Sequence, residues 1–318
     1  MIYHIKDLYR NYRSIQRQIK TNTPYNVKFY NFWKQEIPDM WFYKFLQNCD
    51  IINKKKICFY STFGSRNILN HTKGDVNVFF TGENVKRGSH KLYADHFLTN
   101  ESIDLALGFE SFEDSRYLRF PLWIMYMFNP TSNTENIKKR CQELNFPYIS
   151  HNRKFACHIS SEDQLGLRRK ICIGLSQIAL VDCAGKTMHN CDELWKEYND
   201  DKHSFISKYK FNICPENSNC AGYVTEKIFQ AIAAGCIPIY WGSYNDPETQ
   251  VLNHNAILFW EQDDNNDTLI KTINDLHTSE TRYIEFASQP RLTNDAAEYV
   301  INEYEQLQSR ISEIIKNL

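Results

Sequence analysis

Residues Phe211 to Gly242 read FNICPENSNCAGYVTEKIFQAIAAGCIPIYWG. This stretch opens and closes with short apolar runs, FNIC and CIPIYWG, which are typical of buried strands. Between the runs, apolar side chains recur at helical spacing until a glycine stops the series: Val224, Ile228, Ala231, Ile232 and then Gly235. A strand, a helix and a second strand in this order predict one repeat of a parallel α/β sheet. Pro238 in the second run predicts an edge strand or a bulge.

Similar apolar runs occur along the rest of the chain. In the first half they are NVKFYNFW from Asn26, KICFYSTF from Lys56, VNVFFTG from Val76 and IDLALGF from Ile103. In the second half, KFACHIS, QIALVDCAG and KFNIC alternate with helical segments over 165–175 and from 192. The polar stretch NPTSNTE and a proline precede KFACHIS, which favours a domain boundary near residue 150. The chain is therefore predicted to be α/β, with two Rossmann-like domains.

The end of the chain has a different pattern. Apolar residues between Tyr299 and Ile315 are two to four positions apart, which predicts an amphipathic helix. We expect this helix to pack back on the first domain. The predicted organisation is a first domain over 1–150, a second over 151–295 and a C-terminal helix over 296–318.

The charge balance argues against a general attraction to polyanions. The chain has 37 Lys and Arg against 38 Asp and Glu, for a formal net charge of −1. No nucleic-acid partner is expected, and any phosphate must be bound by a local arrangement. The basic triplets at 54–56 and 168–170 are interpreted as solvated surfaces.

The ten cysteines show no CxxC spacing, which argues against a zinc site. Cys58, Cys172 and Cys236 lie inside apolar runs, where a free thiol behaves as a small hydrophobe. No stretch approaches the length of a membrane helix, and the N-terminal residues lack the apolar core of a secretion signal. These features favour a reducing, cytoplasmic location. Peripheral association with a membrane, or an anchor that this sequence does not include, stays open.

The turn PENSNCAG and the helix that follows it form the candidate site. In a parallel sheet this turn lies at the carboxyl ends of the strands, where ligands bind. The helix is predicted to begin near Tyr223, and a helix N-terminus offers free N–H groups and a partial positive charge to a pyrophosphate. Lys227 would add a full charge, Glu226 could accept hydrogen bonds from ribose hydroxyls, and Asn217 and Tyr223 offer neutral donors. From the residues alone, Glu226 and Lys227 could equally be ordinary polar side chains of a first helical turn.

The elements FNIC, EN, YVTEKIFQA and IPIYWGS together resemble the signature of the α-1,3/4-fucosyltransferases, glycosyltransferase family 10. Upstream, VFFTGEN at 78–84 and LALGFESFEDSRYLRFPLW at 105–123 resemble acceptor-side segments of the bacterial members. The resemblance covers about residues 25–290 and is greatest between 205 and 245.

This resemblance implies the GT-B fold, in which two Rossmann-like domains face each other across a cleft. It implies that the second domain binds GDP-fucose, that the first binds the acceptor sugar, and that transfer inverts the anomeric configuration. The acceptor expected for the family is an N-acetyllactosamine-type glycan, fucosylated on O3 or O4 of GlcNAc. No cofactor is expected to be required, because the chain lacks the DxD spacing of metal-dependent transferases; a divalent ion could stimulate the reaction without being essential.

By the same resemblance, Glu83 of the TGEN segment is the catalytic base that takes the proton of the acceptor hydroxyl. Its rivals are the carboxylates of Asp104, Glu110 and Glu113. The donor-binding residues that the resemblance implies are Lys186, Asn217, Tyr223, Glu226 and Lys227. Lys186 stands where the family has an arginine, and lysine keeps the charge but loses the bidentate fork that arginine offers to phosphate.

Two alternatives stay open. A GT-B transferase for another nucleotide sugar would keep the helix and Lys227 but change the base and the sugar contacts. A non-catalytic glycan-binding relative is the other, since lysine replaces arginine at position 186.

Overall fold

The computed structural model describes residues 2–52, 55–146, 150 and 152–318, which form two compact units. The first unit contains the residues up to Ser132 and resumes with Ile301–Leu318; the second is Asn133–Val300. The expected boundary near residue 150 lies later than this division. The difference arises because helix α5 (Thr134–Asn145) packs against helix α9 (Glu226–Ala233) of the second unit.

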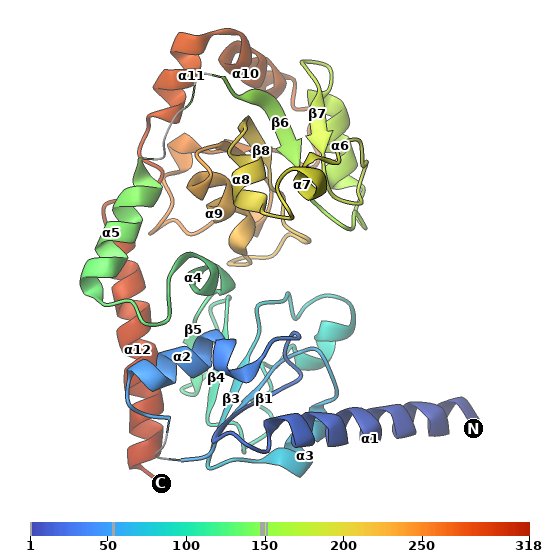
Figure 1. The fold of residues 1–318 in the computed structure, drawn as a ribbon, viewed down its shortest axis with the longest axis vertical. Helices are drawn as coiled ribbons and strands as arrows, with labels where there is room; N and C mark the ends of the chain where they lie inside the picture. The colour runs from blue at the N-terminus through green and yellow to red at the C-terminus, as the bar shows by residue number, and fades with distance from the viewer. Residues whose placement is uncertain (1, 53–54, 147–149, 151) are drawn as a thin grey trace. The chain divides into compact units, whose positions relative to one another are not determined.

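The first unit is built on a five-stranded parallel sheet in which the strands follow the order of the chain, β1-β2-β3-β4-β5 (Figure 1). The strands are β1 (Val27–Tyr30), β2 (Ile57–Tyr60), β3 (Val76–Phe80), β4 (Leu105–Gly108) and β5 (Tyr117–Arg119). The four apolar runs of the first half are confirmed as β1 to β4. No apolar run marks β5, because its three residues are only partly buried.

Helices and a cluster of aromatic rings cover this sheet. The helices are α1 (Ile2–Asn22), α2 (Trp41–Asn48), α3 (Leu69–Thr72) and α4 (Leu122–Met127), with the 3-10 helices η1 (Ile37–Asp39), η2 (Arg66–Ile68) and η3 (Gly88–Tyr93). Phe59 of β2 stacks against both Phe29 and Phe42, with ring centroids 5.2 and 4.8 Å away. Such pairs add to the free energy gained from burying the rings themselves.

The C-terminal helix α12 (Ala296–Lys316) packs on the first unit, as predicted. The Tyr304 ring lies 5.5 Å from the ring of Trp41 and 5.7 Å from that of Phe45. The Tyr304 hydroxyl also donates a hydrogen bond of 2.9 Å to the carbonyl oxygen of Asn129. The amphipathic pattern of this segment therefore reflects burial against α2, a segment far away in the sequence.

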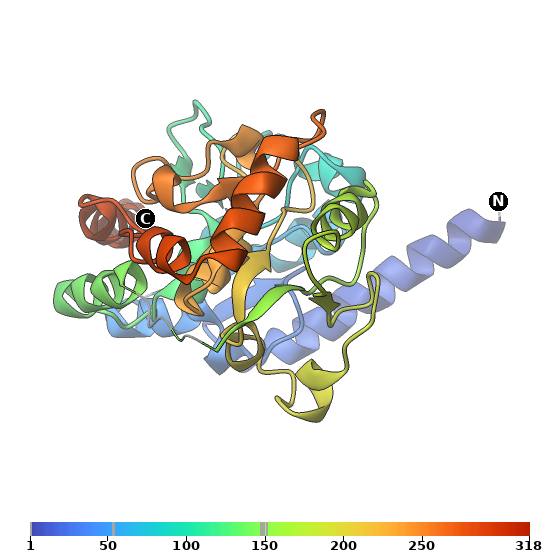
Figure 2. The ribbon, with the colours of Figure 1, turned by 90° about the horizontal axis from the view of Figure 1, so that it is seen from above.

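Helix α1 is held to the first unit through its C-terminal half. The Asn22 amide exchanges two hydrogen bonds with the backbone of Phe29, at 2.7 and 2.9 Å, and Gln18 Oε1 accepts one of 2.7 Å from Asn31 N. Ile15 is buried in the core beside β1 and β2. The preceding part of the helix extends away from the sheet of its own unit, as Figure 1 and Figure 2 show.

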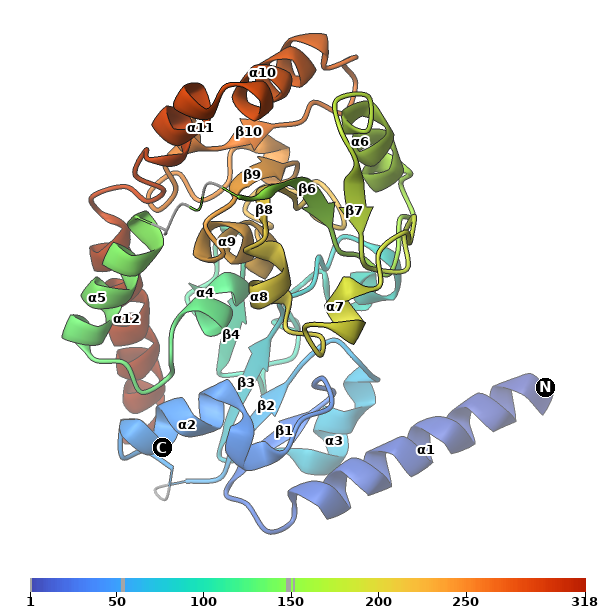
Figure 3. The same cartoon turned by 45° about the horizontal axis from the view of Figure 1, so that its top comes forward.

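The second unit has a five-stranded parallel sheet of order β10-β9-β8-β6-β7 (Figure 3). Its strands are β6 (Lys154–His158), β7 (Val181–Cys183), β8 (Tyr209–Ile213), β9 (Ile237–Tyr240) and β10 (Leu258–Phe259). Besides α5 and α9, its helices are α6 (Leu167–Leu175), α7 (Glu193–Lys196), α8 (Lys202–Ile206), α10 (Asp267–Thr278) and α11 (Glu280–Ala287), with η4 (Ser243–Asn245) and η5 (His254–Ala256). The chain runs from β6 outward to β7 and then returns to the other side of β6, so the strand order reverses between β6 and β8.

Two local expectations for the second unit are wrong. Pro238 is not on an edge strand, because β9 lies between β8 and β10; the pairing with β10 begins only at Ile239, so the proline has a partner strand on one side. Helix α9 begins at Glu226 and not near Tyr223, because Thr225 before it has an extended backbone. Tyr223 therefore belongs to the turn, in which its own side chain is buried.

The ten cysteines are all unbridged, and nine of them are buried. In the part of the chain that the structure describes, no helix combines the length and apolar character needed to cross a membrane.

Candidate active site

A cavity of about 470 Å³ lies in the second unit where the strand order reverses. Its floor is made by the ends of β6 and β8, and its sides come from the segments after β6, β7 and β8 and from helices α6 to α9. The carboxyl ends of parallel strands at such a reversal leave a crevice that commonly holds a ligand. The first sheet has no reversal of strand order.

The polar lining of this cavity is cationic in balance. Four cations, Arg168, Lys186, Lys202 and Lys227, face two carboxylates, Asp200 and Glu226. The whole chain has a net charge of −1, so positive charge is concentrated here. The arrangement favours an anionic ligand that also offers hydroxyl groups to a carboxylate.

Glu216 organises the beginning of helix α9. Its fully buried carboxylate accepts hydrogen bonds from Thr225 N and Thr225 Oγ1, each at 2.7 Å, and from Lys227 Nζ at 2.9 Å. Burial alone would lower the pKa of Lys227, but attraction to Glu216 and, less strongly, to Glu226 raises it above its ordinary value. Lys227 is therefore a fixed, permanently charged group at the start of the helix.

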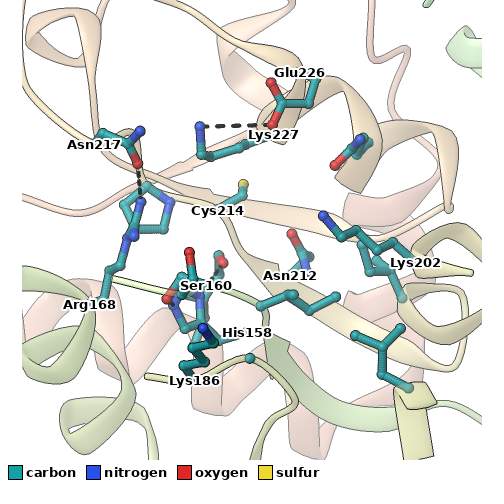
Figure 4. A pocket seen from close by; sticks show the side chains of 18 of the residues that line it. His158, Ser160, Arg168, Lys186, Lys202, Asn212, Cys214, Asn217, Glu226 and Lys227 are labelled. Atoms are coloured by element: carbon teal, nitrogen blue, oxygen red, sulfur yellow. Dashed lines mark hydrogen bonds and ion pairs between the residues drawn. The ribbon is translucent and has the colours of Figure 1, made fainter. Parts of the chain in front are cut away.

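Arg168 supplies a second fixed cation from the first turn of α6. It is only 7% exposed, and Nη2 donates a hydrogen bond of 2.5 Å to Oδ1 of Asn217, which follows β8 (Figure 4). Nη1 donates to the carbonyl oxygen of Glu162. The interpretation of this triplet as a solvated surface is wrong for Arg168, because its side chain is buried and bonded to Glu162 and Asn217. Arg169 beside it is exposed.

The end of β6 and the residues that follow it line one part of the cavity. His158 Nδ1 lies 2.8 Å from the carbonyl oxygen of Ile213 and Nε2 lies 2.7 Å from Ser160 Oγ, so Nδ1 carries the proton and the serine hydroxyl donates to Nε2. Burial lowers the pKa of His158 to about 4, and the ring is neutral. Gly185 after β7 approaches Ser160 so closely that a Cβ atom would lie 2.1 Å from its carbonyl oxygen. Only glycine permits this contact.

The structure brings four of the five expected donor-binding residues to this one cavity: Lys186, Asn217, Glu226 and Lys227. Figure 4 shows Lys227 beside Glu226, Asn217 beside Arg168, and Lys186 on the side of His158. Lys186 is exposed, and among the described residues its ammonium group has no ion pair. Tyr223 does not line the cavity and is 2% exposed.

The sequence alone did not point to Arg168 or His158, and it placed Glu216 in the turn without indicating that its carboxylate is buried. A signal existed for Arg168, because KFACHISSEDQLGLRRKICIGL repeats the strand, polar turn and helix of the quoted stretch and puts an arginine in the first helical turn. Nothing in the sequence distinguishes Glu216 from an exposed turn carboxylate.

Glu83 lies in the first unit, directly after β3, and is half-buried. The Thr81 hydroxyl accepts a hydrogen bond from Glu83 N at 3.1 Å and donates one to its carbonyl oxygen at 3.0 Å. Thr81 N in turn donates to Leu107 O of β4 at 3.0 Å. The backbone that carries the Glu83 carboxylate is therefore fixed to two strands.

A buried carboxylate, that of Glu110, lies at the same end of the first sheet. Glu110, which follows β4, is 2.7 Å from His96 Nε2 and 2.6 Å from Lys86 Nζ. Burial raises the pKa of Glu110, but hydrogen bonds from His96 and Lys86 outweigh this effect, and the pKa lies below its ordinary value. A carboxylate held in this way is a poor proton acceptor.

Family models match both units. The model for "Glycosyltransferase family 10 (fucosyltransferase) C-term" matches residues 149–307, and that for "Alpha-(1,3)-fucosyltransferase FucT N-terminal domain" matches residues 27–126. The chain belongs to glycosyltransferase family 10. Within this family 10 chain, the C-terminal match contains the whole cavity and the N-terminal match contains Glu83.

Relatives and solved structures agree with the family. The alpha-(1,3)-fucosyltransferase FucT of Helicobacter pylori is 28% identical over 267 residues, which cover 74% of this chain and 51% of the relative. The family 10 chain spans about half the length of the curated relatives it matches. A crystal structure of an alpha1,3-fucosyltransferase superposes with a TM-score of 0.64 at 23% identity, covering 91% of this chain and 89% of the other. Another, with GDP-fucose, gives 0.58 at 22% identity and covers 89% of each chain. These likenesses and the two parallel α/β domains show a GT-B fold.

Proposed function

We propose that this family 10 chain transfers fucose from GDP-fucose to a GlcNAc hydroxyl of an N-acetyllactosamine-type glycan, with inversion at the anomeric carbon. The proposal rests above all on Arg168, Lys227 and Glu226, which converge on one cavity at the strand reversal. A similar solved transferase was crystallised with GDP-fucose, which supports this donor. The nucleotide and the pyrophosphate would occupy the cavity of the second unit.

The roles of the donor-binding residues follow from their chemistry. Arg168, whose guanidinium is already positioned by Asn217, and Lys227, positioned by Glu216, would bind the pyrophosphate oxygens. Glu226 at the start of α9 would accept hydrogen bonds from the ribose hydroxyls. We assign to Arg168 the bidentate role that Lys186 cannot fill. Lys186 would add a weaker, solvent-screened attraction.

In the proposed reaction the acceptor hydroxyl oxygen forms a bond to C1 of fucose while its proton passes to the Glu83 carboxylate. The bond between C1 and the β-phosphate oxygen breaks, and GDP leaves with the electron pair. Arg168 and Lys227 would stabilise the charge that develops on the leaving phosphate. Because attack and departure occur on opposite faces of the sugar, the product has the inverted configuration.

The environments of the rival carboxylates favour Glu83 as the base. Glu110 is committed to His96 and Lys86. Asp104 precedes β4 and accepts a hydrogen bond of 2.7 Å from Asn77 N, which puts it at the amino end of the strands, the end opposite Glu83. Glu113 is exposed.

The test is to incubate the chain with GDP-fucose and either Galβ1-4GlcNAc or Galβ1-3GlcNAc and to read the products by mass spectrometry. NMR of the product then gives the linkage, O3 or O4, and the anomeric configuration. GDP-mannose and UDP-galactose serve as control donors. The absence of a fucosylated product with every acceptor would contradict the proposal, and turnover of a control donor instead would favour a transferase for another nucleotide sugar.

A matched pair of variants tests the base. Glu83→Gln should abolish transfer and leave GDP binding intact, whereas Glu113→Gln should leave both unchanged. Equal activity of the Glu83→Gln variant and the unaltered chain would rule out Glu83 as the base.

A further inference from the structure

Helix α1 carries a surface that the family 10 matches do not include, since they begin at residue 27. Arg10, Arg13, Arg17 and Lys20 recur at spacings of three and four and therefore lie on one side of the helix. All four are exposed. Asp7, one turn before Arg10, is the one acidic residue in the sequence of α1, against five Lys and Arg, and no further Asp or Glu occurs before Glu36. The helix sequence therefore keeps a clear excess of positive charge.

Two exposed aromatic residues border the cations. Tyr9 and Tyr12 are 58% and 57% exposed, and the guanidinium of Arg13 lies 5.2 Å from the centroid of the Tyr9 ring. The opposite side of the helix is the one that docks, through Ile15 and Asn22, onto the first unit. The basic and aromatic side thus points away from the unit that holds the helix.

We propose that this side of α1 binds an anionic membrane surface, with the cations on lipid phosphates and the tyrosines at the level of the headgroups. A helix with cations beside aromatic residues is suited to lie in the plane of such an interface. Tyrosine is enriched there because one end of its ring is apolar and the other can be hydrated. The docked C-terminal half fixes the direction of the helix, and the part that extends from the sheet in Figure 1 and Figure 2 is the part that offers the tyrosines.

Other occupants fit less well. In a two-fold contact between copies of this chain, the basic side would face its own like-charged equivalent. A single-stranded nucleic acid would be attracted by the cations and would stack its bases on the tyrosines, but the chain as a whole has a net charge of −1, which disfavours a polyanion that extends beyond this one helix.

The experiment is co-sedimentation of the full chain with two kinds of vesicle. One contains phosphatidylcholine alone, and in the other a quarter of the lipid is replaced by anionic phosphatidylglycerol. Binding to the anionic vesicles, weakened by salt, is expected. The variant with Arg10→Gln, Arg13→Gln, Arg17→Gln and Lys20→Gln should bind about 600-fold more weakly, because each of the four cations near an anionic surface contributes about fivefold. The matched control removes four exposed lysines elsewhere and should bind normally: Lys91→Gln, Lys138→Gln, Lys139→Gln and Lys316→Gln.

A third variant, Tyr9→Ser with Tyr12→Ser, should retain salt-sensitive binding at reduced affinity. The proposal is overturned if phosphatidylglycerol does not increase the binding of the chain to vesicles. It is also overturned if the two quadruple variants lose vesicle binding to the same extent. It is also overturned if the α1 substitutions abolish a dimer or RNA binding while vesicle binding is unchanged. The readout needs no donor or acceptor sugar, so its result is independent of the proposed reaction.

Discussion

Nζ of Lys227 lies 2.9 Å from Oε2 of Glu216, a carboxylate that is fully buried beneath the start of helix α9. The same ammonium group lies 2.7 Å from the Thr225 hydroxyl. An ammonium group has three donors, so two hold it in place and one is left for a ligand. Lys227 is thereby oriented before any phosphate arrives, which reduces the entropy lost on binding.

The Glu216→Gln substitution should destabilise the second unit strongly. The glutamine side-chain amide cannot both accept the hydrogen bonds from Thr225 and neutralise the charge of Lys227. Breaking a buried ion pair typically costs about 3–5 kcal/mol. Urea denaturation measures the loss. Glu226→Gln, at the partly exposed carboxylate that directly follows Thr225, is the control and should change the free energy of unfolding by less than about 0.5 kcal/mol. Similar losses in both variants would mean that Glu216 has no special structural role.

The Arg168→Lys substitution should weaken GDP binding by about tenfold or more, since a hydrogen bond to a charged group contributes about 1.5–3 kcal/mol. Lysine cannot contact Asn217 and a phosphate at once in the manner of a guanidinium. Isothermal titration calorimetry with GDP gives the affinity. Arg169→Lys, at the exposed neighbour, is expected to bind GDP normally. Unchanged affinity in the Arg168→Lys variant would contradict the assigned role.

The Glu110→Gln substitution should mainly lower the stability of the protein, whereas Glu83→Gln should mainly stop the transfer reaction. Loss of the Glu110 carboxylate removes the partner of Nε2 of buried His96, so we expect a loss of about 1–3 kcal/mol in stability with measurable transfer remaining. Glu83→Gln should abolish transfer while GDP binding is retained. Thermal unfolding and the transfer assay together separate the two. The base would have to be reassigned if Glu110→Gln alone stopped the reaction in a folded protein.

Stability should fall in mild acid through His158. Its pKa is lowered from about 6.5 to about 4 by burial, so below pH 6.5 the unfolded chain binds a proton that the folded chain does not. The contribution of neutral His158 to the free energy of unfolding is complete above pH 6.5 and declines as the pH falls toward 4. Between pH 7 and pH 4.5 this amounts to about 2 kcal/mol.

Urea denaturation at the two pH values measures this change. Carboxylates titrate in the same pH range and also change the stability, so the unaltered chain is compared with the His158→Gln variant. Between the two pH values, the free energy of unfolding of this variant should fall by about 2 kcal/mol less than that of the unaltered chain. An identical pH dependence in both proteins would show that His158 does not titrate as its burial requires.

Much of the architecture was predictable from local pattern. Each apolar run of the first half became a strand, and KFACHIS, QIALVDCAG, KFNIC and CIPIYWG became strands of the second sheet. Burial on both faces of a parallel sheet demands such runs, so they are visible in the sequence. Strand β5 could not be predicted from the sequence, because its residues are only partly buried and follow no apolar pattern.

The sequence by itself determined the α/β class, the cationic helix start at Lys227 and the family. Tertiary structure decided which side chains share the cavity. It brought in Arg168 from α6, buried the Tyr223 side chain away from the cavity, and made Glu216 the buried partner of Lys227. Secondary structure follows from residues close together in the chain, and the sequence records their spacing. A site formed where the strand order reverses joins segments up to about 70 residues apart, between Ser160 and Gln230, and their meeting depends on the packing of the whole sheet.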